Sequence, residues 1–192
     1  DLVDNGQIYA LPIYVDTLAL YYNKNLLNSA GIASPPDDWD NFVEAVRDLT
    51  RVDSRGNIIL AGAALGTARN VNRSTDILML MMLQSGTQMV DRQQNSATFS
   101  SSVDGQPVSQ AALEFYTDFA NPEKSVYTWN DNLFYSIDAF TTERTAMMFN
   151  YSHHIGTIRS KALRLNFGVA LMPQISGSSG RVDYASYFAP AV

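Results

Sequence analysis

Residues 8–29 of the chain read IYALPIYVDTLALYYNKNLLNS, and this stretch decides the fold. Its β-branched and aromatic residues predict extended chain over Ile8–Tyr14 and a strand over Thr17–Asn23, followed by a short helix over Lys24–Ala30. A single carboxylate, Asp16, stands between the two apolar runs. Because a bare carboxylate is costly to bury, Asp16 either accepts backbone hydrogen bonds at a strand end or lines an open cleft.

The composition indicates a globular protein. Of the 192 residues, 46% are apolar and 17% are charged, enough for one domain with its own core or for one domain plus a fragment. The net charge of -6 and the lack of any Lys/Arg cluster disfavour a nucleic-acid partner. Without cysteine, the chain forms no disulfide and has no thiolate chemistry.

The sequence shows no membrane span and no targeting segment. A spanning helix needs about 20 apolar residues, and the longest apolar run is only Ile77–Leu83. The chain begins at Asp1, with neither a methionine nor a signal peptide. We therefore expect it to be a processed piece of a longer protein.

Both helices and strands are expected along the chain. Asp37 or Asp38 can cap a helix whose apolar face comprises Trp39, Phe42, Val43, Val46 and Leu49. A helix over Thr75–Ser85, capped by Ser74, is apolar nearly all round and is therefore expected to be buried. The other expected elements are strands over 58–65, 145–150, 166–171 and 184–192 and a hairpin over 87–102. Three further helices are expected, one beginning near Pro107, a short one over 136–142 and one through Ile158 and Leu163.

A long series of residues resembles one known family. The series comprises Leu11-Pro12, Val15-Asp16, Leu18–Tyr22, Asn23-Lys24, Leu27, Ala30-Gly31-Ile32, Pro35-Pro36, Trp39-Asp40, Phe42, Ala45 and Leu49-Thr50. In this order it is similar to the segment in which bacterial extracellular solute-binding proteins, the sugar-binding family of ABC importers, cross from their first lobe into their second. The resemblance continues more weakly to about Pro173, and Glu143 stands where the family has a glycine in a turn.

The resemblance implies an α/β fold, a three-layer αβα lobe of the type 2 periplasmic-binding-protein fold with hinge strands. Residues 1–12 would be a hinge and first-lobe remnant, residues 13–168 the second lobe, and residues 169–192 a hinge and a truncated first-lobe segment. The implied function is capture of a mono- or oligosaccharide between two closing lobes, without catalysis, metal or cofactor, for delivery to a membrane permease. The resemblance also implies a monomer in the periplasm or outside the cell, anchored as a lipoprotein through a segment absent from this chain.

The residue types at the expected segment ends suit a sugar. Sugars present apolar C–H faces, which aromatic rings cover, and a rim of hydroxyl groups, which polar side chains bind. In open α/β sheets, ligands lie outside the strand ends. The candidate ligand-binding residues are Tyr14, Asp16, Thr67, Arg69, Asn70, Trp129, Asn150, Tyr151, His153 and Tyr184. By resemblance, Tyr151 or His153 takes the place of an aromatic residue, often tryptophan, that stacks on the sugar.

Three other functions stay open at this point. A carbohydrate hydrolase needs two paired carboxylates, and its scattered candidates are Asp16, Asp131, Asp138, Glu143 and Asp183. The same fold could instead bind a polyamine or a ferric ion, and Tyr21-Tyr22 is similar to the tyrosine pairs of iron-binding relatives, although core packing explains it better. The adjacent His153 and His154 would point to opposite faces of an extended segment, which suits a shared metal poorly. An adhesion or signalling module is the third alternative.

Overall fold

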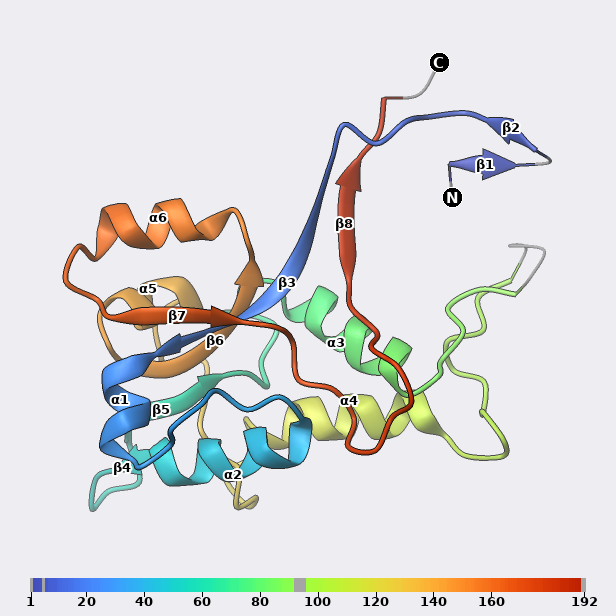
Figure 1. Ribbon diagram of the computed structural model, residues 1–192. Helices are drawn as coiled ribbons and strands as arrows, with labels where there is room; N and C mark the ends of the chain where they lie inside the picture. Colours follow the sequence, from blue (N-terminus) through green and yellow to red (C-terminus); the bar gives the residue numbers. More distant parts are fainter. Residues whose placement is uncertain (1, 5, 92–95, 191–192) are drawn as a thin grey trace.

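The computed structural model describes residues 2–4, 6–91 and 96–190. Its main sheet has the strand order β4-β5-β6-β3-β7, formed in that order by Arg51–Val52, Ile58–Ala64, Thr145–Tyr151, Tyr14–Asn23 and Phe167–Ala170. β5 and β6 are parallel, whereas β3 is antiparallel to both β6 and β7. The sheet is therefore mixed, with β3 between two antiparallel neighbours (Figure 1).

β3 is a long strand that changes partners halfway along its length. Its first half pairs with β8 (Ala185–Phe188), so that Asp16 stands opposite Ser186. Its second half pairs with β6 on one side and β7 on the other, and Leu18 stands opposite Tyr151. In Figure 1, β3 and β8 accordingly leave the layered part of the molecule side by side. Asp16 lies next to the point where the partner changes.

Helices cover both faces of the sheet (Figure 1). α2 (Trp39–Leu49) and α4 (Val108–Asp118) lie on one face, and α5 (Ser136–Thr141) and α6 (His154–Lys161) lie on the other. α1 (Lys24–Ser29) follows β3 directly, and α3 (Ser74–Gln84) packs against α4. The short strands β1 (Val3–Asp4) and β2 (Gln7–Ile8) pair only with each other among the described residues. None of the described helices has the length and apolarity needed to cross a membrane.

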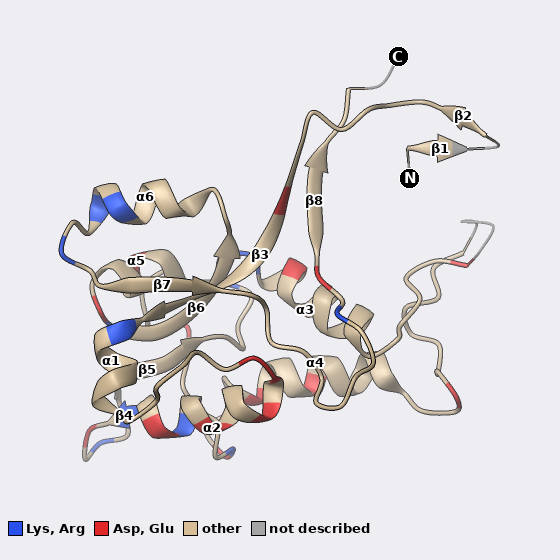
Figure 2. Ribbon diagram, in the orientation of Figure 1, with Lys and Arg blue, Asp and Glu red and all other residues tan. Residues whose placement is uncertain are grey.

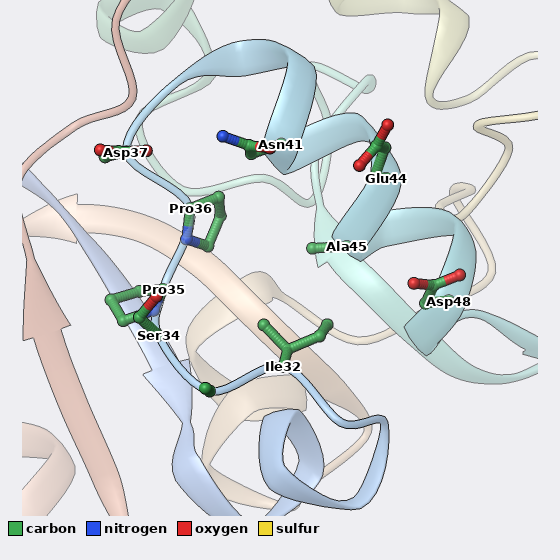
Figure 3. A pocket seen from close by; sticks show the side chains of 10 residues that line it. Ile32, Ser34, Pro35, Pro36, Asp37, Asn41, Glu44, Ala45 and Asp48 are labelled. Carbon is green, nitrogen blue, oxygen red and sulfur yellow. The ribbon is translucent and has the colours of Figure 1, made fainter.

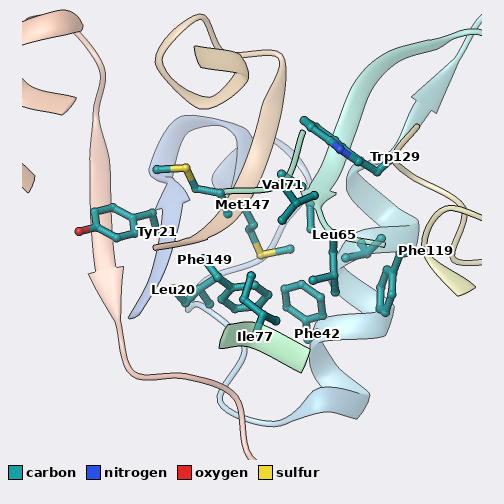
Figure 4. Close-up of a cluster of buried hydrophobic side chains, with 14 of the residues drawn as sticks. Leu20, Tyr21, Phe42, Leu65, Val71, Ile77, Phe119, Trp129, Met147 and Phe149 are labelled. Atoms are coloured by element: carbon teal, nitrogen blue, oxygen red, sulfur yellow. The ribbon is translucent and has the colours of Figure 1, made fainter. Parts of the chain in front are cut away.

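Aromatic side chains fill the core on both sides of the sheet. On one side, the ring of Phe149 in β6 lies 5.2 Å from the ring of Phe42 in α2 (Figure 4). On the other side, the ring of Tyr21 in β3 lies 6.3 Å from the rings of both Phe140 and Phe167. Every residue of β6 is buried, because helices cover both faces of the strand. The fold is the three-layer α/β arrangement that the resemblance implied.

Side chains cap the N-termini of α1 and α2. The side chain of Asn23 accepts hydrogen bonds from the first backbone N–H groups of α1. Asp38 caps α2 as predicted, since its Oδ1 accepts a hydrogen bond of 2.7 Å from the backbone N–H of Asn41. Each cap satisfies a donor that the first turn of a helix leaves unpaired.

Three extended segments are shorter than expected, and one of them is the strand expected over 184–192, which is limited to Ala185–Phe188 among the described residues. In the stretch 8–14, only Ile8 and Tyr14 belong to strands, and Pro12 between them has no N–H to donate to a neighbouring strand. The hairpin expected over 87–102 reduces to an isolated bridge between Val90 and Ala97, and residues 92–95 at its tip lie outside the described residues.

The helix α3 is not buried all round, contrary to the expectation from its apolar sequence. Its buried residues are Ile77, Leu80 and Met81, whereas Met79 is 37% exposed. The helix lies at the end of the layered body, beside β8 (Figure 1), so one of its faces has no neighbouring layer. Arg73 rather than Ser74 occupies the capping position, with a left-handed φ of 70° and no side-chain capping bond.

Glu143 takes the left-handed conformation that the resembling family assigns to a glycine. Its φ is 59°, in the turn between α5 and β6. A side chain in this region costs about 1–2 kcal/mol relative to an ordinary conformation. The carboxylate offsets part of this cost by accepting a hydrogen bond of 3.0 Å from Asn23 Nδ2. The turn therefore keeps its geometry without the glycine.

Candidate ligand-binding site

Several candidate residues gather at one edge of the sheet. Since β5 and β6 are parallel, their carboxyl ends lie at the same edge, and the loops that lead to α3 and α6 begin there. The first half of β3 and its partner β8 extend away from this edge (Figure 1). Ligands of open α/β sheets bind outside such carboxyl ends.

Asp16 is held by the loop that follows β6. Its Oδ1 accepts hydrogen bonds from the hydroxyl of Ser152 at 2.5 Å, the backbone N–H of Thr17 at 2.8 Å and the backbone N–H of Ser152 at 3.0 Å. Its Oδ2 lies 2.7 Å from Nδ1 of His153 and 3.3 Å from the backbone nitrogen of the same residue. Asp16 is therefore buried and fully paired.

These contacts set the charge of Asp16. Burial alone would raise the pKa of the Asp16 carboxyl, but the hydrogen bonds from Ser152, His153 and Thr17 hold it well below its usual range. Asp16 is thus ionised wherever the protein is folded near neutral pH. Its negative charge lies at the N-terminus of α6, where a helix favours an anion.

Tyr151 forms the centre of the edge, but its ring is not free. The residue is only 5% exposed, and its hydroxyl donates a hydrogen bond of 2.9 Å to Asp76 Oδ2. The guanidinium of Arg73 lies 5.0 Å from the ring centroid, and the imidazole of His153 stacks at 6.0 Å with an interplanar angle of 18°. Burial raises the pKa of Tyr151 to about 12. A stacking role of Tyr151 on a sugar is therefore corrected to a supporting role.

His153 and two tyrosines supply the accessible part of the edge. The side chain of His153 is 53% exposed. The hydroxyl of Tyr184 lies 3.8 Å from the sulfur of Met79, and Asp76 raises the pKa of this phenol in addition to its burial. Tyr14, half-exposed on β3, packs its ring 5.5 Å from that of Phe188. The structure thus brings Asp16, Tyr151, His153 and Tyr184 to one edge, with Tyr14 further out on β3.

A second set of candidates belongs to the interior. Trp129 is 0% exposed, and its Nε1 donates a hydrogen bond of 2.9 Å to Asn70 Oδ1. Asn70 also accepts a hydrogen bond from Thr67 and donates two to the backbone carbonyls of Asn130 and Leu133. All hydrogen-bonding capacity of the Asn70 side chain serves the protein. The expected ligand contacts of Asn70 and Trp129 are corrected to an internal support for the loop after β5.

The remaining two candidates differ in their exposure. Arg69 is exposed on the loop after β5. Asn150 is completely buried in β6, where its Oδ1 accepts a hydrogen bond of 2.9 Å from the backbone N–H of Tyr151. The Nδ2 of Asn150 and the Nδ1 of His154 are buried without a hydrogen-bond partner in the described part of the chain. Contrary to the expectation from the sequence, Asn150 does not face a ligand site in this structure, because its side chain has no exposed surface.

Sequence reasoning missed three residues of this edge. Ser152 binds Asp16, Asp76 binds Tyr151, and Arg73 covers the Tyr151 ring. Arg73 and Asp76 begin an otherwise apolar helix, so composition alone did not mark them. A usable signal was their position, because a helix that follows a parallel strand begins at the edge where ligands bind.

A separate hollow lies away from this edge. It has a volume of about 290 Å³ and lies between the linker 32–37 and α2, with Asp37, Glu44 and Asp48 at its rim (Figure 3). Acidic residues recur along α2 (Figure 2).

Within the described ranges, no group of three or more acidic or histidine side chains is placed to hold a metal ion. Tyr21, the possible iron ligand, is a core residue whose hydroxyl donates a hydrogen bond of 2.7 Å to the backbone carbonyl of Tyr151.

Comparison with known proteins identifies the class. The profile of the family described as bacterial extracellular solute-binding protein matches residues 1–192, and the chain belongs to this family. The melibiose/raffinose/stachyose-binding protein MelE of Bacillus subtilis is 40% identical over 55 residues, which are 29% of this chain and 12% of MelE. The proteins of this family and MelE are described as binding proteins.

Solved structures of sugar-binding relatives share the fold. A solute-binding protein of an ABC transporter from Thermotoga lettingae, bound with α-D-tagatose, matches 98% of this chain with a TM-score of 0.71 and 21% identity. The maltodextrin-binding domain MalE of Bdellovibrio bacteriovorus, bound to maltotriose, matches 99% with a TM-score of 0.69 and 16% identity. The chain spans 46% and 47% of these two structures, about half of their length.

Stability is expected to fall in mildly acidic solution because of His154. Burial and the nearby His153 and Arg73 lower the pKa of His154. The unfolded chain therefore binds this proton more readily than the folded chain, so the stability is complete above the unfolded pKa of about 6.5 and is lost as the pH falls through the folded pKa. The urea midpoint should drop between about pH 7.5 and about pH 5.5. The substitution His154→Gln should flatten this dependence, and a flat profile in the wild type would contradict the expectation.

Proposed function

We propose that this chain is one lobe of an extracytoplasmic solute-binding protein that captures a mono- or oligosaccharide, or a related polyol, for an ABC importer. The observation that carries the proposal is the edge of the sheet where the exposed imidazole of His153 and the partly exposed phenol of Tyr184 stand on a hydrogen-bonded base that includes Tyr151 and Asp16. Such groups suit the hydroxyl rim and C–H faces of a sugar. Membership of the solute-binding family supports the same reading.

The lobe in this proposal comprises residues 13–168, with residues 1–12 and 169–192 as hinges and first-lobe remnants. The surface of the extended strands supports it. Large apolar side chains are exposed there, namely those of Ile8, Leu11, Ile13, Val15 and Phe188. Exposed apolar patches of this kind mark interaction surfaces. The other half of the parent protein would cover the patch on these extended strands.

The proposed mechanism is closure of two lobes on the ligand. A ligand that contacts both lobes binds the closed state more tightly and shifts the open–closed equilibrium towards it. The strands β3 and β8 connect the layered lobe to the remaining protein and would carry the motion. The parent would work as a monomer in the periplasm or outside the cell, held by a lipoprotein anchor and docking on a permease. It would need no cofactor.

Binding without catalysis fits the local chemistry. The hydroxyl of Ser152 donates its hydrogen bond to Asp16. Because hydrogen bonds hold the pKa of the Asp16 carboxyl well below its usual range, this carboxylate is a poor base for activating the hydroxyl as a nucleophile. A glycoside hydrolase needs two carboxyl groups that flank the scissile bond, and Asp16 is occupied by protein donors. Release of sugar from an aryl glycoside, lost on Asp16→Asn, would nevertheless favour the hydrolase.

Calorimetry with D-tagatose, mannobiose, maltotriose and D-mannitol tests the proposal, because related structures hold these compounds. We expect weak binding by the isolated chain, since one lobe supplies half of the contacts, and tighter binding by the parent protein. His153→Ala should reduce the heat of binding, whereas Phe134→Ala, a change at an exposed side chain in the loop before α5, should not. Submicromolar affinity of the isolated chain would contradict the one-lobe reading. Tight polyamine binding or a chelator-sensitive colour with ferric ion would favour the alternative ligands.

A further inference from the structure

The carboxylate of Asp16 has no capacity left for a ligand. A carboxylate offers about four lone-pair positions, and five polar groups of Thr17, Ser152 and His153 already lie within hydrogen-bond distance of it. An acidic residue at the edge of a binding site would ordinarily be assigned to the ligand hydroxyls. In this chain Asp16 instead holds the residue that contacts the solvent, His153.

The contact with Asp16 determines where His153 carries its proton. An ionised carboxylate only accepts hydrogen bonds, so Nδ1 of His153, 2.7 Å from Oδ2, must be the donor. In the neutral imidazole the other nitrogen, Nε2, then has a free lone pair and acts as an acceptor. No described residue donates to Nε2, and the His153 side chain is half-exposed at the site edge.

We propose that Asp16 is a positioning residue that fixes His153 as the Nδ1–H tautomer, so that Nε2 accepts a hydrogen bond from a hydroxyl group of the ligand. The inference rests on the proposed function and specifies one recognition element within it. It selects a ligand with a hydroxyl donor, such as a neutral sugar or polyol, over a carboxylate or phosphate. An anionic group would need a donor at this position, and neutral His153 does not supply one.

The surroundings of His153 favour this arrangement. Asp16 faces it from β3, Tyr151 stacks on it from β6, and His154 at the start of α6 lies 4.3 Å away between ring centroids. Arg73 contributes positive charge beyond the Tyr151 ring.

Nitrogen NMR of the histidine side chains in the chain without ligand tests the tautomer directly. In the wild type, Nε2 of His153 should show the shift of an unprotonated nitrogen, and Nδ1 that of a protonated one. In D16N the amide oxygen should remain with the three donors that now bind Oδ1, which places the amide NH₂ group towards His153. The proton should therefore move to Nε2. The control S152A removes a donor to Oδ1 but leaves the Asp16–His153 contact, so its His153 signals should match the wild type.

The binding measurement uses the best ligand of the panel and its monodeoxy analogues. One monodeoxy analogue should bind the wild type about tenfold more weakly than the full sugar, the equivalent of one hydrogen bond. Because a hydroxyl oxygen can also accept from a protonated Nε2, D16N should change the affinity for the sugar by less than this, whereas an anionic analogue, which only accepts hydrogen bonds, should gain affinity for D16N relative to the wild type. A protonated Nε2 in the wild type, or an unchanged tautomer in a folded D16N, would overturn the inference even if sugars bind. If the tautomer is as expected but no panel member binds either this chain or the parent protein, the proposed function fails, and the ligand contact with it.

Discussion

Phe42→Ala should destabilise the chain by about 3–5 kcal/mol, the range for removing a large aromatic ring from a packed core. Phe42 is completely buried in α2, and its ring lies 5.4 Å from that of Trp39, 5.9 Å from that of Phe119 and 5.2 Å from that of Phe149. The substitution leaves a cavity between the sheet and two helices, because the aromatic neighbours cannot close around an alanine without moving their backbones. Urea denaturation with linear extrapolation measures the loss.

The matched control for Phe42→Ala is Phe134→Ala. Phe134 is 68% exposed, so its removal should change the stability by less than about 0.5 kcal/mol. Equal effects of the two substitutions would mean that the contact between α2 and β6 does not form the core. A loss below about 1 kcal/mol for Phe42→Ala alone would contradict the packing described above.

Trp129→Ala should have an effect of similar size, about 3–5 kcal/mol. The substitution removes a fully buried indole and also one of the two donors to Asn70 Oδ1, which leaves part of a buried amide unsatisfied. Trp129→Phe keeps most of the ring but loses the hydrogen bond, and a smaller loss is expected. Both variants should be compared with the wild type by urea denaturation and by calorimetry with the sugar panel.

This pair of variants separates the internal role of Trp129 from the role expected from the sequence. If Trp129 stacked on a ligand, its removal would abolish sugar binding and leave the stability unchanged. The structure predicts the reverse order of effects, with a large loss of stability. Under conditions where the variant remains folded, the affinity should change little, because the indole presents no surface to the solvent.

Local pattern was sufficient to predict most of the fold. The β-branched and aromatic residues of β3 and the helical spacing after Asp38 are properties of a few neighbouring residues, and the structure confirms the strand and the helix that they predict. The exposure of α3 could not be predicted in this way. The apolar sequence around Met79 shows that α3 could be buried on every side. The position of α3 at the end of the layers determines which of its faces other elements cover.

The candidate site was predictable only where sequence neighbours become spatial neighbours. Tyr151 and His153 are two residues apart and flank Ser152, so their common position at the end of β6 was apparent. Asn70 and Trp129 had the residue types that a sugar requires, but they are 59 residues apart and bind each other. Composition could not distinguish a polar group that serves a ligand from one that serves the interior. Of the two alternatives for Asp16, the structure shows the acceptance of backbone N–H groups, from Thr17 and Ser152.

The change of partner within β3 has a mechanical consequence. Beyond Asp16 the strand is half of a two-stranded ribbon, whereas from Leu18 onward it is clamped between β6 and β7 in a sheet with helices on both faces. The ribbon has fewer hydrogen-bonded neighbours to resist twisting than the sheet has, so we expect it to twist more easily than the part of β3 that begins at Leu18. A rotation of the far ends of β3 and β8 would therefore twist the ribbon about its own axis. Asp16 and the imidazole of His153, which lie where the ribbon meets the sheet, would stay in place.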